Sequence, residues 1–209
     1  MEILERLFGH TIKVKLMRLF IFNPDEAFTL EDATHRVKGA RDPVRSEIVG
    51  LEKTGLVKRT NFIKDVEVRN RKGEKESERR KVAGFTLDKR FRYLSALQNL
   101  LLDTSPAVSN QLLKRLKKSG RIKLVAVAGV FVQDYDNRID LLVVGDRLNR
   151  VSIDQTMRTV ESEIGRELKY AVLETADFKY RIGVCDKLIR DIFDYQHRIL
   201  LDNIGVNYK

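Results

Sequence analysis

The 209-residue chain has a single cysteine, Cys185, and only three histidines. One cysteine forms no disulfide within the chain, and a cysteine-based zinc site needs several more. The histidines, His10, His35 and His197, lie far apart without metal-ligand spacing, so we expect no metal and no other cofactor. No apolar run approaches the roughly 20 residues of a membrane span, and the acidic N-terminal segment is unlike a signal peptide. These absences predict a cytoplasmic protein with no membrane partner.

Positive charge exceeds negative charge in this sequence. Lys and Arg number 40 against 30 Asp and Glu, which gives a net charge of +10. This excess favours a polyanionic partner such as nucleic acid, although a merely soluble basic protein would have the same composition. Hydrophobic residues make up 43% of the chain, which is enough for packed cores. The length suits one large domain or two small ones.

The first half of the chain is predicted to contain three helices. Apolar residues at helical spacing between residues 4 and 20, broken once at Gly9, predict the first. The second is predicted to begin at a capping box formed by Thr29 and Asp32, in which the aspartate replaces the usual glutamate. The third is predicted to begin at a cap on Asp42 and to end at Gly55, which would take the left-handed conformation.

A β-hairpin is predicted after the third helix. Apolar residues alternate with polar ones on both sides of a charged stretch, residues 70–77, which predicts two strands joined by a charged turn. Three helices followed by a hairpin describe a winged helix. Residues 7–58 also resemble the winged helix-turn-helix family of prokaryotic regulators, most closely in LEKTGLV, where the third helix leads into the wing.

The resemblance implies that the third helix reads DNA in the major groove. If Val44, Ile48 and Leu51 face the core, the polar side chains of this helix face outward. The hairpin would then grip the DNA backbone, although a solvated charged turn explains its charges equally well. Winged helices also mediate protein contacts, which keeps that alternative open. The candidate DNA contacts are Arg41, Arg45, Ser46, Lys53, Arg69, Arg71, Lys72, Lys75, Arg79 and Arg80.

The second half is predicted to form a smaller α/β domain, which makes the chain α+β as a whole. We expect a winged helix domain at 1–90, a helical connector at 91–120 and the α/β domain at 121–209. The predicted order after residue 120 is strand, strand, helix, strand and helix. The predicted elements are Lys123–Val127, Ile139–Val144, Ser152–Ile164, Leu168–Leu173 and Val184–Tyr195.

Residues 125–145, VAVAGVFVQDYDNRIDLLVVG, are similar to the core of the minimal nucleotidyltransferase family within the polymerase-β-like superfamily. In that family a Gly-Ser turn brings backbone amides to a triphosphate, and an Asp-x-Asp pair holds metal ions. Here Gly129 is present, but Val130 replaces the serine and Arg138 replaces the first aspartate, which leaves only Asp140. The resemblance therefore implies a degenerate nucleotide site with no catalytic residue and no metal. The stretch from Arg198 also resembles the closing strand of regulators that contain this domain.

Two interpretations of the remaining acids stay open. We favour Asp140 as a buried or capping acid kept by the fold, paired with Arg138 or Arg121. In the other interpretation, Asp134, Asp136 or Glu174 completes a rearranged metal site.

We therefore expect a transcriptional regulator that binds double-stranded DNA as a homodimer. The second domain would dimerise or bind a nucleotide or protein ligand, and the apolar helix at 91–102 is a candidate dimer interface or else part of a core. The alternatives are an active nucleotidyltransferase that modifies a protein, a tRNA or a small molecule, and a nucleic-acid-binding adaptor with no regulatory role.

Overall fold

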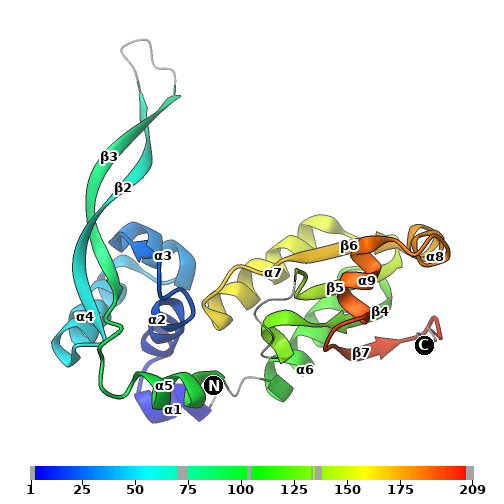
Figure 1. Cartoon of the computed structure of the whole chain (residues 1–209), viewed down its shortest axis with the longest axis horizontal. Coiled ribbons are helices and arrows are strands. Elements are labelled where there is room, and N and C mark those ends of the chain that lie inside the picture. Colours follow the sequence, from blue (N-terminus) through cyan, green and yellow to red (C-terminus); the bar gives the residue numbers. More distant parts are fainter. Residues whose placement is uncertain (1–2, 70–74, 103–104, 133, 135–137, 206–209) are drawn as a thin grey trace. The chain divides into compact units, whose positions relative to one another are not determined.

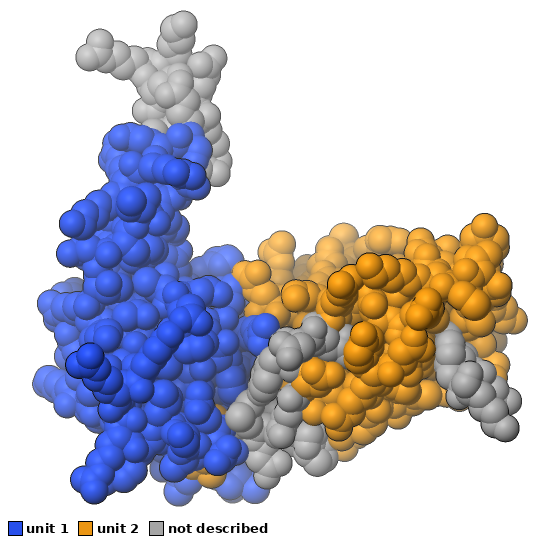
Figure 2. Space-filling model, in the orientation of Figure 1, with its two compact units in different colours: residues 1–99, 162–166 blue, residues 100–161, 167–209 orange. Residues whose placement is uncertain are grey.

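The chain divides into two compact units. A computed structural model describes residues 3–69, 75–102, 105–132, 134 and 138–205. It is a mixed α+β protein, as the sequence predicts, with nine α-helices and two sheets within those residues (Figure 1). Figure 2 colours the units, which are Met1–Asn99 with Ser162–Arg166 (unit 1) and Leu100–Glu161 with Glu167–Lys209 (unit 2). No helix in the described residues is long and apolar enough to cross a membrane.

The segment expected to join the domains, residues 91–120, is helical and crosses the boundary between the units. It contains α5 (Leu94–Leu102) and α6 (Ser105–Leu116). The boundary at Asn99 and Leu100 falls inside α5.

Unit 1 combines helices with a three-stranded antiparallel sheet. Its other elements are α1 (Ile3–Phe8), α2 (Thr11–Phe22), β1 (Ala27–Phe28), α3 (Leu30–Val37), α4 (Arg41–Thr54), β2 (Val57–Arg69) and β3 (Lys75–Leu87). The strand order is β1-β3-β2. The predicted hairpin is confirmed, because β2 and β3 pair continuously from Val57 opposite Leu87 to Arg69 opposite Lys75. The turn itself, residues 70–74, lies outside the described residues.

The start of α3 follows the predicted capping box. Thr29 Oγ1 accepts a hydrogen bond from the Asp32 backbone N–H at 3.1 Å, and Asp32 Oδ2 accepts one from the Thr29 N–H at 3.0 Å. Each residue thus satisfies a backbone donor that the helix leaves without a partner.

The predicted cap on Asp42 is wrong. The N-cap is Ala40, two residues earlier, so helix α4 begins at Arg41, and Ala40 makes no side-chain hydrogen bond. Asp42 instead lies in the first turn, where its negative charge still complements the helix dipole. The other end is as predicted, because Gly55 takes the left-handed conformation with φ 83° and its N–H bonds back to Glu52 and Leu51.

Replacing Thr29 with alanine should lower the free energy of unfolding of unit 1 by ~1 kcal/mol at neutral pH, the usual contribution of such a cap. Burial opposes the charge of Asp32, but hydrogen bonds from Lys64 and Thr29 outweigh it and hold the pKa of Asp32 below its usual value. Because a lowered pKa stabilises the fold above the ordinary pKa and loses this effect in acid, the variant's deficit should shrink below about pH 4.

Thermal unfolding followed by circular dichroism at neutral and acidic pH measures this difference. The exposed Ser46 on α4 provides the control, and Ser46→Ala should stay within about 0.5 kcal/mol of the parent protein. An equal deficit for Thr29→Ala at both pH values would contradict the role given to the ionised Asp32.

Unit 2 contains a four-stranded mixed sheet with helices on both faces. Its remaining elements are β4 (Arg121–Val127), a 3-10 turn η1 (Gly129–Val132), β5 (Leu141–Asp146), α7 (Arg150–Ile164), β6 (Tyr170–Glu174), α8 (Thr175–Gly183), α9 (Lys187–Phe193) and β7 (Arg198–Asp202). The strand order is β6-β5-β4-β7, in which only β5 and β6 run parallel. The last residues of α7 are those counted with unit 1.

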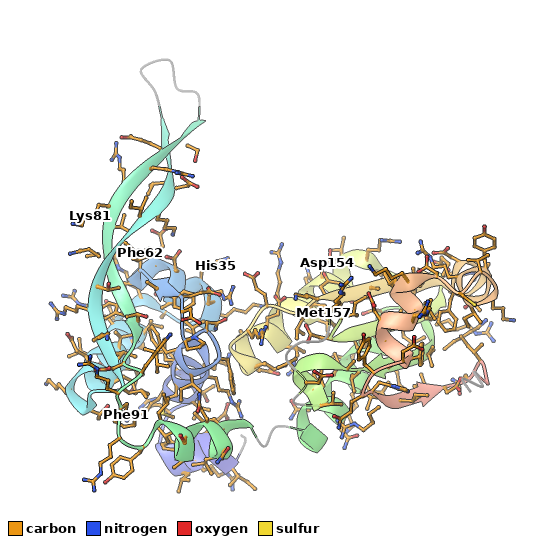
Figure 3. All side chains as sticks on the ribbon, viewed as in Figure 1. His35, Phe62, Lys81, Phe91, Asp154 and Met157 are labelled. Carbon is orange, nitrogen blue, oxygen red and sulfur yellow. The ribbon has the colours of Figure 1, made fainter. Side chains whose placement is uncertain are left out.

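The two faces of this sheet follow from strand alternation. Leu124 and Ala126 of β4 belong to a buried cluster with residues of α8 and α9. Val125 and Val127 point the other way, where α6 and α7 supply buried residues such as Met157, labelled in Figure 3. Both faces are therefore covered.

The predicted final helix, Val184–Tyr195, is wrong in extent. Within this range only Lys187–Phe193 is helical, as α9, and a separate helix that was not predicted, α8, ends just before it at Gly183. Cys185, between the two helices, has the left-handed φ of 51°. The side chain of Asp186 then caps α9 by accepting the Leu188 N–H. The predicted closing strand from Arg198 is confirmed as β7.

Candidate nucleic-acid interface

A groove lies between α4 and the hairpin strands of unit 1. It has a volume of about 380 Å³. We call it the α4 groove, and its lining residues are Leu30, Arg41, Arg45, Ile48, Val49, Arg59 and Phe85. A second hollow of about 350 Å³ shares Leu30, Arg59 and Phe85 and extends along the strands past Thr60, Asn61, Ala83 and Gly84. A helix and a sheet thus enclose one concave surface that carries three arginines.

The direction of the α4 side chains follows from its buried stripe. Val44, Ile48 and Leu51 are at most 2% exposed, as predicted. Arg41 and Arg45 lie one turn apart on another side of the helix, and both line the α4 groove. Among the described residues neither arginine has an acidic partner, so both guanidinium groups remain available to an external anion.

Ser46 and Lys53 occupy the neighbouring row of the same helix. Both side chains are exposed. They do not line the groove, but residues four and seven positions apart share a face of an α-helix. The four α4 residues predicted to contact DNA therefore all lie on its solvent side.

Arg59 is a groove residue that our sequence analysis missed. Its Nε donates to Glu52 Oε1 at 2.8 Å and its Nη2 donates to Glu52 Oε2 at 3.1 Å. This paired geometry holds the guanidinium over the groove while 72% of the side chain stays exposed. Strand alternation was the available signal, because Val57 is buried and a residue two positions later lies on the same face.

The charges along the hairpin divide between its two faces. Arg79 pairs directly with Asp65 across the strands and lies on the Arg59 face, whereas Arg80 lies on the opposite face and bonds to Glu78. Lys81 also lies on the Arg59 face, whereas Phe62 lies on the other face. Both side chains are labelled in Figure 3. The side chains of Arg69, Arg71, Lys72 and Lys75 lie outside the described residues.

The turn that resembles a nucleotide site is held in place by hydrogen bonds to the side chain of Asp140. Asp140 directly precedes β5 and is 9% exposed. Its Oδ1 accepts the Val130 N–H at 2.9 Å, and its Oδ2 accepts the Lys169 N–H at 2.8 Å. Gly129 has φ +52°, and a Cβ there would lie 2.1 Å from Asp140 Oδ1. Both carboxylate oxygens are thus used to hold the turn and β6 together.

The other residues considered for this site lie elsewhere. The ion pair expected between Asp140 and Arg138 or Arg121 is wrong. Arg138 Nη1 is 3.9 Å from Asp191 Oδ2 of α9, and Arg121 lies opposite Asp146 at the other end of β5. Glu174 pairs with Gly145 at the far end of the parallel strands, about 16 Å along the sheet from Asp140 at 3.3 Å per residue. Asp134 donates its backbone N–H to the Gly129 carbonyl, and Asp136 lies outside the described residues. In the described part of the chain no three His, Cys, Asp or Glu residues are grouped to hold a metal ion.

The structure thus defines a two-unit α+β protein with a basic groove on one unit and a buried carboxylate at a strand turn of the other. Comparison of the chain with protein-family models, curated proteins and solved structures finds no match.

Proposed function

We propose that the protein is a DNA-binding transcriptional regulator in which unit 1 is a winged helix-turn-helix. The observation that carries this proposal is the α4 groove, where Arg41, Arg45 and Arg59 face solvent between a helix and a β-ribbon. B-form DNA admits an α-helix into its major groove, and arginine recognises both guanine edges and phosphates. Helix α4 would read base edges, and the hairpin would contact the backbone beside it.

The order of elements supports the winged helix assignment. Helices α2, α3 and α4 precede the hairpin, and the short strand β1 adds to the edge of β3. The short connection between α3 and α4 includes Lys38 at a left-handed φ of 52°. Such a tight turn between two helices is the supersecondary motif by which many proteins present a recognition helix to DNA.

In this proposal, unit 2 is a nucleotidyltransferase-like domain that does not catalyse nucleotide transfer. The strand-turn-strand around Gly129 and Asp140 supports the resemblance, and the loss of the serine and the first aspartate supports inactivity. Transfer in that superfamily needs at least two carboxylates on metal ions. Here Asp140 already accepts two backbone hydrogen bonds. The unit would instead serve dimerisation or the binding of a nucleotide or protein ligand.

Selection of bound fragments from genomic DNA tests the proposal. A regulator should enrich fragments that share one sequence motif, and the enrichment should depend on Arg45. Fragments enriched without a shared motif would fit an adaptor that binds DNA regardless of sequence. Failure to retain DNA at low salt would reject the proposal.

The regulator should be a homodimer, because one recognition helix reads few base pairs and a specific site usually joins two half-sites. Tyr93, just before α5, and Leu100, on α5, are 59% and 42% exposed, which supports this segment as the contact between copies. Light scattering at micromolar concentration should give twice the mass of the chain. A monomer at that concentration would count against the dimer, and a dimer unchanged by Tyr93→Ser and Leu100→Ser would move the interface elsewhere.

A further inference from the structure

A second basic surface lies in unit 2, where two turns meet. The segment from residue 105 to 121 contains five Lys and Arg residues and no acid. It includes the turn between α6 and β4 and ends at Arg121, the first residue of β4. Two more arginines follow β5: Arg147 lies in the turn between β5 and α7, and Arg150 is the first residue of α7. We call Lys117, Lys118, Arg121, Arg147 and Arg150 the basic turn patch.

Hydrogen bonds hold the two turns side by side. The Asn149 N–H donates to the Ser119 carbonyl at 2.8 Å, and the hydroxyls of Ser119 and Ser152 are 2.8 Å apart. Gly120 has φ +138°, and a Cβ there would lie 2.8 Å from the Arg147 carbonyl oxygen. Because only glycine permits this approach, the cations of both turns are held at one end of unit 2.

The cations of the patch are exposed and lack local neutralisation. All five side chains are solvent-exposed. Among the described residues, no ion pair involves Lys117, Lys118, Arg147 or Arg150. The only acid in residues 105–121 and 146–152 is Asp146, and Lys123 Nζ already contacts its Oδ2 at 2.7 Å. Helix α7 also begins here, and its N-terminal N–H groups add positive potential.

We propose that the basic turn patch is a second DNA-contacting surface, which binds the phosphate backbone without reading sequence. Its cations are spread over two turns and separately exposed, which suits a row of phosphates rather than one small anion. A surface for anionic membranes would add several large apolar side chains, and here only Val151 is large, apolar and strongly exposed. The choice of DNA as partner rests on the function proposed for unit 1.

Lysine modification of the full-length protein tests the patch directly. The protein is treated with an amine-reactive acetylating reagent, with and without a long duplex of mixed sequence at low salt, and each lysine is quantified by mass spectrometry. Lys117 and Lys118 should react severalfold more slowly with DNA present, while the exposed Lys179 and Lys187 of unit 2 should not change. Unchanged reactivity of Lys117 and Lys118 would overturn the proposal, as would protection by anionic phospholipid vesicles but not by DNA.

The reactivity of Lys53 on α4, measured in the same experiment, distinguishes failure of the patch proposal from failure of the proposed function. Protection of Lys53 without Lys117 and Lys118 would reject the patch and keep the regulator. Protection of Lys117 and Lys118 alone would support the patch and count against DNA binding by α4. No protection at any of the three lysines would reject both.

Charge removal gives a second, independent measurement. The variant Lys118→Ala, Arg147→Asn, Arg150→Ala removes three charges, and asparagine suits the left-handed φ of 52° at position 147. The slope of log affinity against log salt should fall by about 0.9 for each lost phosphate contact. The control Lys169→Ala, Lys179→Ala, Lys187→Ala removes the same charge from other exposed positions of unit 2. Equal slopes for the two variants would overturn the proposal.

Discussion

Replacing Asp140 with alanine should lower the free energy of unfolding by ~3 kcal/mol. The side chain is buried and accepts the backbone N–H groups of Val130 and Lys169, 2.9 and 2.8 Å away. Alanine would remove the partner of the buried Val130 N–H and of the partly buried Lys169 N–H. A buried donor left unsatisfied costs about 1–3 kcal/mol. Gly129→Ala should also destabilise, because its Cβ would displace Asp140 Oδ1. Chemical denaturation of the purified variants measures both effects.

Asp134→Ala is the matched control, since it removes a nearby carboxylate that is less buried. It should change stability by no more than about 0.5 kcal/mol. The same proteins are incubated with labelled nucleoside triphosphates, Mg²⁺ or Mn²⁺, and either tRNA or the protein itself as acceptor. We expect no label transfer from any of them. Transfer by the parent protein that disappears in a stably folded Asp140→Ala would mean that Asp140 is catalytic and that the inactive assignment fails.

Local signals in the sequence predicted much of unit 1. The capping box of Thr29 and Asp32 and the left-handed Gly55 depend on bonds within a few residues, so the sequence alone contains them. The stripe of Val44, Ile48 and Leu51 is likewise set by helical periodicity. The cap on Asp42 failed because Ala40 can take an extended conformation without help from its side chain. A shift of two residues at a helix end is beyond what residue preference determines.

Contacts between distant segments explain what the sequence did not predict. The prediction of Asp140 as a buried or capping acid is confirmed, but the sequence did not predict its second partner, the N–H of Lys169, 29 residues later. The basic turn patch depends on a bond from Asn149 to Ser119, which no local pattern records. The face of the sheet on which a residue lies is easier to predict, because alternation from the buried Val57 would have placed Arg59 beside α4. In these cases the sequence does not show which strands and turns pair with one another.

Replacing Arg45 with alanine should weaken binding to a selected DNA site roughly tenfold to hundredfold. Arg45 lies in the α4 groove on the second turn of α4 and has no acidic partner among the described residues. Two hydrogen bonds from one arginine to guanine contribute about 1–3 kcal/mol of discrimination, and each 1.4 kcal/mol is about a factor of ten. Binding to random DNA should fall much less, because it depends on total charge rather than on base contacts.

Alanine variants of two other arginines distinguish the loss of a base contact from the loss of positive charge. Arg59 is held by Glu52 beside the strands, as expected for a phosphate contact, so Arg59→Ala should weaken specific and random binding alike and lower the salt slope by about one unit. Arg90 is exposed on unit 1 and does not line the groove, so Arg90→Ala should leave the affinity ratio unchanged. Fluorescence anisotropy with the selected and a scrambled duplex, over a range of salt, gives all three ratios. If Arg45→Ala leaves the specific-to-random ratio at the parent value, helix α4 is not the recognition helix, because losing a base contact must lower that ratio.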